Sequence, residues 1–92
     1  MWTLDVGIPA RSTVEDTMKM RDQITKKFGA ALYSSTAWGF VEFQMRYADK
    51  IEALKAKLGV KAFLQQKGFE VVDGEVSTGE AYVICQPEKE LI

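Results

Sequence analysis

The most pronounced hydrophobic pattern in the chain is an alternation over residues 37–45, which predicts a β-strand with two different faces. The apolar face is typical of a core and carries Val41, Phe43 and Met45. The opposite face combines two large aromatic rings with two polar groups: Trp38, Phe40, Glu42 and Gln44. A buried face would avoid Glu42, and a solvated face has no need of neighbouring aromatic rings. We therefore expect this face to lie under a loop or to bind a partner.

Two further elements are expected before this strand. Residues 2–8 alternate between apolar and polar side chains, which predicts a half-buried strand. A helix is expected over residues 12–28, because Ser12 and Glu15 have the spacing of a capping box at its start. Gly29 follows directly and is the expected helix stop.

The middle of the chain allows more than one interpretation. Residues 30–36 could form a short strand or a loop, and a short strand or irregular extended segment is slightly favoured. Residues 47–58 have an apolar stripe at helical spacing, and Gly59 would end that helix before a shorter helical piece over residues 60–67. The stripe consists of Tyr47, Ile51, Leu54 and Leu58. A single kinked helix is the alternative.

The C-terminal part is expected to be extended. Residues 69–76 and 80–86 are rich in β-branched and aromatic side chains, and residues 77–79 provide a turn that would make them a hairpin. We expect one domain over residues 1–87, followed by a flexible tail at residues 88–92. The element order predicts an α+β two-layer sandwich, ferredoxin-like or a variant of it, with a mostly antiparallel sheet of about four strands and two main helices on one face.

This architecture would leave one sheet face uncovered by helices. The candidates for that face come from the first strand and from the strand at residues 37–45: Asp5, Trp38, Phe40, Glu42 and Gln44. Aromatic rings and carboxylates on an uncovered sheet face would be available to a partner.

Composition reduces the range of functions. The chain has 92 residues, of which 47% are hydrophobic and 27% are charged, and its net charge is −1. It contains no histidine, the most frequent general base and zinc ligand. Its single cysteine excludes a disulfide within the chain. We expect a non-enzymatic protein without catalytic residues, metal or cofactor. A less favoured hypothesis is an enzyme that acts through the carboxylates of Glu42 or Asp5.

The N-terminal residues lack the pattern of a secretory signal, and no apolar run reaches the about 20 residues of a membrane helix. These features predict a cytoplasmic protein, in the producing cell or in a host cell, with no membrane partner. The sequence does not decide between a monomer and a homodimer.

Charge is unevenly distributed along the chain. Residues 11–68 carry a net charge of +5, whereas residues 69–92 carry −5. This asymmetry could orient a charged partner, or the two parts could neutralise each other within the fold. Within the basic part, a row of cations flanks the stripe of the second helix: Arg46, Lys50 and Lys57, beside Lys61. Arg21 lies in the apolar arc of the first helix and could pair locally or bind an anion or partner.

Residues 36–43 resemble the eight-residue signature strand of the RNA recognition motif family, through Gly39, Phe40, Val41 and Phe43. Residues 4–9 are faintly similar to the second signature strand of that family. The resemblance implies that Trp38 and Phe40 stack on bases. The chain departs from the pattern at three positions and in one spacing. Thr36 replaces a basic residue, Ala37 replaces a glycine, and Asp5 occupies the place of a stacking aromatic. Only residues 29–35 separate the first expected helix from the signature strand, which is too few for a full strand and loop.

The interpretation that we favour is a small binding protein that acts on a protein or nucleoprotein partner as a steric inhibitor or adaptor. One concrete form would be a phage-encoded inhibitor of a host or CRISPR-type defence complex. The alternative is a single-stranded RNA or DNA binder that uses an aromatic sheet face, with the basic row on phosphates. The expected partner-binding residues are Trp38, Phe40, Arg46, Lys50, Lys57 and Arg21.

Overall fold

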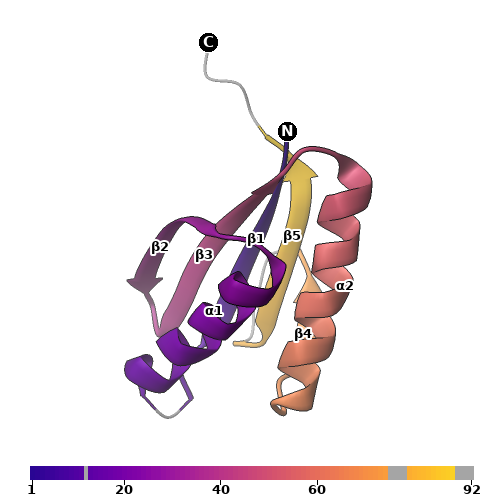
Figure 1. Ribbon diagram of the computed structural model, residues 1–92. Coiled ribbons are helices and arrows are strands. Elements are labelled where there is room, and N and C mark those ends of the chain that lie inside the picture. Colours follow the sequence, from indigo (N-terminus) through magenta and orange to yellow (C-terminus); the bar gives the residue numbers. More distant parts are fainter. Residues whose placement is uncertain (12, 75–78, 89–92) are drawn as a thin grey trace.

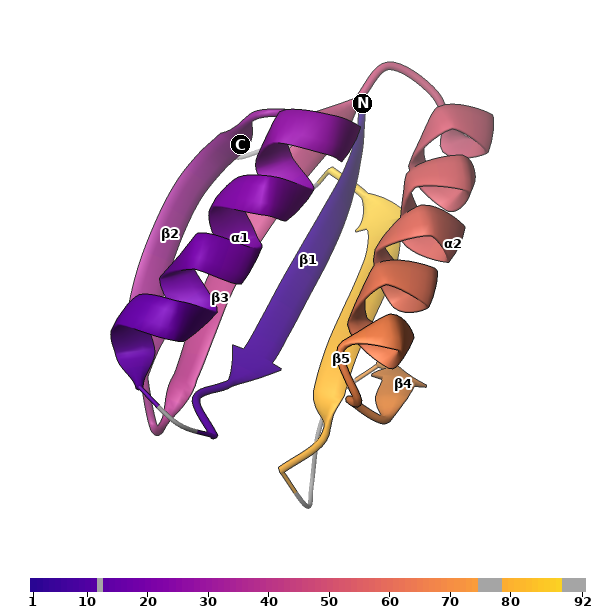
Figure 2. The same cartoon turned by 60° about the horizontal axis from the view of Figure 1, so that its bottom comes forward.

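The computed structural model describes residues 1–11, 13–74 and 79–88. In chain order its elements are β1 (Trp2–Pro9), α1 (Val14–Phe28), β2 (Ala31–Ala37), β3 (Phe40–Tyr47), α2 (Lys50–Gln66), β4 (Val71–Asp73) and β5 (Ala81–Pro87). The strands form one sheet, and both helices lie on the same side of it (Figures 1 and 2). The predicted α+β fold with two layers is confirmed.

The sheet has the strand order β2-β3-β1-β5-β4, with β1 at its centre. β1 pairs antiparallel with β3 and β5, and β2 pairs antiparallel with β3. The four longer strands therefore have the arrangement of a split βαβ pattern. β4 adds a fifth strand at the edge and runs parallel to β5. The protein is consistent with a variant of the ferredoxin-like arrangement, with one strand more than the four expected.

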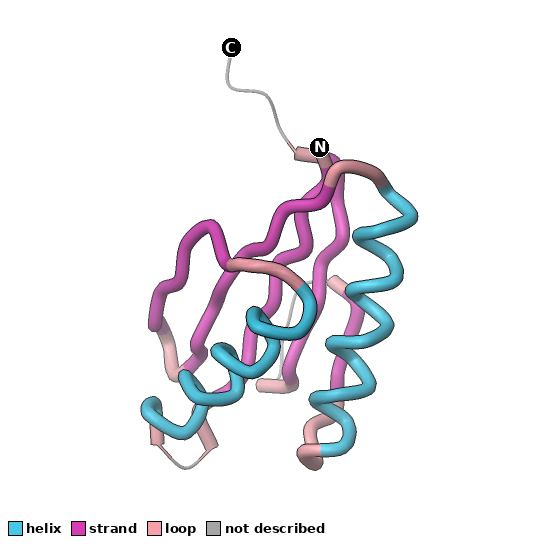
Figure 3. Tube along the Cα trace, in the orientation of Figure 1, coloured by secondary structure: helices cyan, strands magenta, loops and turns pink. Residues whose placement is uncertain are grey.

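The core lies between the sheet and the two helices, which appear in cyan in front of the strands in Figure 3. Alternate residues of the central strands face this layer, and the predicted core face of β3 is confirmed, because Val41, Phe43 and Met45 are buried. β1, β5 and the helices supply the other large buried apolar side chains: Leu4, Val6, Ile8, Val83, Ile24, Val60 and Leu64. Burial of such side chains contributes roughly 1.5–3 kcal/mol each.

α1 begins one residue later than the capping-box spacing indicates. Thr13 is the N-cap, and its hydroxyl accepts a hydrogen bond of 3.0 Å from the backbone N–H of Asp16. The predicted N-cap, Ser12, lies outside the described residues. The helix ends at Phe28 as predicted, and the N–H of Gly29 donates to the Thr25 carbonyl.

α2 corrects two expectations about the middle of the chain. It is one continuous helix that begins after the N-cap Asp49 and passes through Gly59 without a break. The predicted apolar stripe was wrong as well, because Ile51 and Leu58 are 67% and 64% exposed, and Tyr47 belongs to β3. The helix packs on the sheet through another set of side chains, two of which are alanines: Ala53, Ala56, Val60 and Leu64.

The strand expected at residues 37–45 is divided by a turn. β2 ends at Ala37, Trp38 and Gly39 form the turn, and β3 begins at Phe40. Ala37 pairs directly with Phe40, so this is a two-residue hairpin loop. Residues 30–36 therefore belong largely to a full strand, and Trp38 does not lie on the sheet face that the alternation predicted.

The expected C-terminal hairpin was wrong, because β4 and β5 are parallel neighbours. β4 has only three residues, and the N–H of Gly74 donates to the Val83 carbonyl at 3.0 Å. Residues 77 and 78 of the predicted turn lie outside the described residues. At the opposite end of β5, the N–H of Glu88 donates to the carbonyl of Met1, so the N-terminus lies beside the end of β5 (Figure 1).

Candidate functional site

The sheet face opposite the helices is the main candidate surface, and we call it the open face. Alternation within the paired strands places residues of β1, β2, β3 and β5 on it. β1 contributes Thr3, Asp5 and Gly7; β2 contributes Tyr33, Ser35 and Ala37; β3 contributes Phe40, Glu42, Gln44 and Arg46; β5 contributes Tyr82, Ile84 and Gln86. The prediction that Phe40, Glu42 and Gln44 share a face with Asp5 is confirmed.

Aromatic rings from the two strands that flank β1 approach each other across the centre of the open face. The ring of Tyr82 lies over Gly7, where a β carbon would come to 2.0 Å from ring carbon Cε1. The absence of a side chain at Gly7 therefore allows Tyr82 to reach across β1. The centroids of the Phe40 and Tyr82 rings are 6.1 Å apart at an interplanar angle of 49°, a tilted arrangement that is favourable for aromatic pairs.

Two carboxylates lie beside these rings. Asp5 accepts hydrogen bonds from the side-chain amides of Gln44 at 2.6 Å and Gln86 at 3.0 Å. These two residues belong to the strands on either side of β1 and stand opposite Asp5 and Thr3. Glu42 interacts with the Tyr82 hydroxyl. The open face thus places the carboxylates of Asp5 and Glu42 close to its aromatic rings.

Burial and the neighbouring carboxylates raise the pKa values of two tyrosines on the open face. Burial, followed by the charge and hydrogen bond of Glu42, raises the pKa of Tyr82 to about 12. Burial and the charges of Asp5 and Glu42 also raise the pKa of Tyr33. Both pKa values lie above the ordinary value of 10.0, so both hydroxyls are protonated at neutral pH.

Trp38 lies off the open face, at the tip of the β2–β3 hairpin, and its side chain is 97% exposed. Its φ of 56° and the φ of 78° at Gly39 place both turn residues in the left-handed region. Such hairpin turns favour Asn, Asp or Gly, and a bulky residue in this conformation is strained. Neither burial within this chain nor backbone preference therefore explains why a tryptophan occupies this turn position.

The predicted basic row is not a free surface. Lys57 and Lys61 reach the carboxylate of Asp73 on β4, at 3.6 and 3.2 Å. The charges of the helical part and the C-terminal part meet within the fold at this point. These contacts favour the interpretation that the two parts neutralise each other.

The remaining predicted cations also have local partners. Arg46 lies on the open face and forms an ion pair with Glu88. Lys50 lies over the ring of Trp2, with Nζ 5.4 Å from the ring centroid. Arg21 donates to the hydroxyl of Ser34 at 2.8 Å and to Asp22 at 2.9 Å, so it links α1 to β2. Of these cations only Arg46 shares the open face with Phe40, at the opposite end of β3, and Trp38 lies apart in the hairpin turn.

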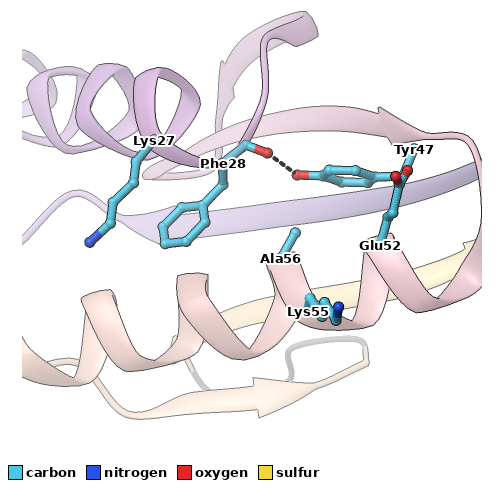
Figure 4. A pocket seen from close by; sticks show the side chains of 6 residues that line it. All are labelled: Lys27, Phe28, Tyr47, Glu52, Lys55 and Ala56. Carbon is cyan, nitrogen blue, oxygen red and sulfur yellow. Dashed lines mark hydrogen bonds between the residues drawn. The ribbon is translucent and has the colours of Figure 1, made fainter.

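A hollow of about 500 Å³ lies between the end of α1 and the first turns of α2 (Figure 4). Its lining residues are Lys27, Phe28, Tyr47, Glu52, Lys55 and Ala56. The hydroxyl of Tyr47 donates to the Phe28 carbonyl at 2.7 Å and so closes one side of it. Burial raises the pKa of Tyr47. This hollow has mixed charge and a single fixed hydrogen bond, so its chemistry selects no ligand.

Sequence reasoning missed two central residues of the open face, Gly7 and Tyr82. Residues 82–85 are apolar at nearly every position, which is typical of an interior strand and hides which side chain faces outward. The signal that could have found the pair is the position of Gly7, a residue without a side chain in the middle of a regular strand pattern.

The chain matches no family model, no curated protein and no solved structure.

Within the described ranges, no group of three or more Cys, Asp or Glu side chains is placed to hold a metal ion. Neither of the two described helices has the length and apolar character required to cross a membrane.

Proposed function

We propose that this chain is a non-enzymatic binding protein that holds a protein partner with basic side chains against its open face. The observation that carries the proposal is the placement of Tyr33, Phe40 and Tyr82 around the carboxylates of Asp5 and Glu42, on a sheet face that neither described helix covers. A non-catalytic protein acts by occupying or bridging surfaces. Steric inhibition, for example of a host or CRISPR-type complex by a phage-encoded protein, is the form of action that we favour.

The chemistry of the open face selects cationic groups. A lysine or arginine side chain of a partner could place its charge between an aromatic ring and a carboxylate, where cation–π attraction and ion pairing act together. Arg46 is the only Lys or Arg within the five strands, and Glu88 already neutralises it. The unbalanced charges of this face are therefore those of Asp5 and Glu42.

The alternative, binding of single-stranded nucleic acid, has less support from the same geometry. Of the two stacking residues that the resemblance implied, Phe40 lies on the open face and Trp38 lies in the turn. Asp5 and Glu42 would repel phosphates at the centre of the platform, whereas nucleic-acid surfaces are usually basic. We therefore treat nucleic-acid binding as an outcome of the test below.

The test measures fluorescence anisotropy of labelled probes at rising protein concentration. The probes are a panel of Arg- and Lys-rich peptides, acidic peptides of matched length, and single-stranded RNA and DNA oligonucleotides. We expect at least one basic peptide to bind with an affinity that decreases with salt. Replacing Glu42 by Gln should weaken this binding about tenfold, a loss of about 1.4 kcal/mol.

Glu15→Gln serves as the matched control, because it removes the same charge from the exposed first turn of α1, on the helix side of the sheet. Basic peptides that bind the Glu42→Gln protein as well as they bind wild type would refute the role of the open face. If oligonucleotides bound more tightly than every peptide, the result would support the nucleic-acid alternative instead.

A further inference from the structure

The two edges of the sheet are protected to different degrees. An edge strand exposes unpaired backbone groups, and natural sheets usually shield them by shortness, charge, proline or a β-bulge. β4 is such a shielded edge, because it has only three residues and its last residue, Asp73, engages Lys57 and Lys61. β2 is longer, with seven residues, and contains neither a charged residue nor a proline.

β2 is also uncovered on its faces. All seven of its residues are exposed, and the side chains of Leu32 and Tyr33 are 48% and 55% exposed. In an antiparallel pair, the backbone groups of alternate residues point toward the partner and those between them point away. Ala37 closes the hairpin opposite Phe40, so Ser34 and Thr36 direct their backbone groups to the outer edge. A bulge between Ala31 and Tyr33 interrupts the start of β2, and the strand pairs regularly with β3 from Tyr33 to Ala37.

We propose that β2 pairs antiparallel with β2 of a second copy of this chain, with the two-fold axis at Ser34. Ser34 is the middle residue of β2, so this register overlaps the whole strand with its copy. Thr36 then stands opposite Leu32 of the partner copy. No like charges face each other along the pair, because β2 contains no charged residue. The strand is therefore complementary to itself.

The exposed apolar residues identify a second copy, rather than an unrelated strand, as the occupant. They lie at both ends of β2: Leu32 near its start, and Trp38 directly after its end. Antiparallel symmetry brings the end of each strand next to the start of the other. Trp38 of each copy would then lie beside residues 30–32 of its partner, twice in one dimer, and this contact would compensate for its strained turn position.

The dimer would have one continuous sheet. A two-fold axis perpendicular to the sheet keeps both helical layers on one side and both open faces on the other. The pairing uses backbone groups and the hairpin tip, whereas the proposed partner contacts use side chains of the open face, of which only Tyr33 belongs to β2. The inference therefore stands on its own observations, and its failure would leave the proposed function untouched.

The first test compares Thr36→Pro with Thr36→Val by sedimentation equilibrium. Proline removes the N–H that faces the outer edge and leaves the bonds to β3 in place, whereas valine keeps the N–H and the β-branched shape. We expect a concentration-dependent dimer for wild type and Thr36→Val, and a dissociation constant at least tenfold higher for Thr36→Pro. A wild-type protein that stays monomeric at all accessible concentrations would overturn the proposal, as would equal dissociation constants for the two variants.

The second test determines the register by oxidative cross-linking. Ser34→Cys would place two thiols across the axis at a Cα separation of about 5.5 Å, within disulfide reach. In Ser35→Cys the two residues lie about two positions out of register, which is too far for a disulfide. Both proteins retain Cys85, so its contribution cancels. We expect dimeric product from Ser34→Cys alone, and equal yields from both variants would refute the register and with it the symmetric pairing.

Discussion

The ring of Phe28 lies against the α carbon of Gly59, so that a β carbon at position 59 would come to 2.3 Å from ring carbon Cε1. Glycine in the middle of a helix normally costs about 1 kcal/mol relative to alanine. α2 nevertheless continues through Gly59, because the missing side chain makes room for a ring from α1. This contact joins the two helices of the layer.

Replacing Gly59 by Ala should therefore destabilise the protein in spite of the better helix propensity of alanine. We expect the free energy of unfolding to fall by about 1–2 kcal/mol, as for overpacking of a filled contact. The control is the same change in a Phe28→Ala background, where the space is free and the change should stabilise by up to about 1 kcal/mol. Urea unfolding of the four proteins gives both values, and a stabilising effect in both backgrounds would contradict the proposed contact.

Gly59 also shows what the sequence could not reveal. A glycine after an apolar stripe is a frequent helix stop. Only the position of Phe28, thirty-one residues earlier in the chain, explains why the helix passes through. The same applies to the stripe of α2. Small alanines bring the helix close to the sheet, while Ile51 and Leu58 face outward, and periodicity alone does not distinguish two apolar sides of one helix.

Features that depend on residues close together in the sequence were predicted correctly. The alternation of β1 and of the later part of β3, the end of α1 at Gly29 and the α+β class follow from patterns within a few residues of each other. The β2–β3 turn was missed because Trp38 is not a residue that favours positive φ. The parallel pairing of β4 was missed because a turn signal between two extended segments predicts a hairpin.

Stability should decrease at alkaline pH because of Tyr82. The pKa of Tyr82 in the folded protein is about 12, compared with an ordinary value of 10.0. The folded state retains the proton when the unfolded state loses it, so the stabilising contribution is complete below pH 10 and is lost as the pH rises toward 12. Tyr82→Phe should show a shallower decrease in the free energy of unfolding over this window, measured by urea unfolding at several pH values.

The slope of the variant will not vanish, because the pKa values of Tyr33 and Tyr47 are also raised. Glu42→Gln tests the cause: removal of the carboxylate charge should lower the pKa of Tyr82 toward its ordinary value. Ultraviolet titration of the phenolates measures this directly. An unchanged titration curve in Glu42→Gln would contradict the contact between these two side chains.

Asp73→Asn should weaken the attachment of β4 to α2. Lys57 and Lys61 lower the pKa of Asp73, chiefly through the hydrogen bond of Lys61. The contribution of the charged form is present at neutral pH and is lost as the pH falls below the ordinary value of 3.8. Because the pairs are exposed, we expect a loss of only about 0.5–1 kcal/mol at low salt. High salt should abolish the difference between wild type and variant, and a difference that persists there would indicate a packing effect.

Trp38→Asn should stabilise the isolated chain while it removes a binding group. The φ of 56° at this position is tolerated by asparagine and strained for tryptophan, and the exposed ring contributes no packing within the chain. We expect a gain of about 1 kcal/mol in the free energy of unfolding, measured at a protein concentration low enough to exclude association. Trp38→Phe keeps a large aromatic ring in the same strained conformation and should show no gain. A loss of stability in Trp38→Asn would mean that the ring is held by this chain itself, which its 97% exposure contradicts.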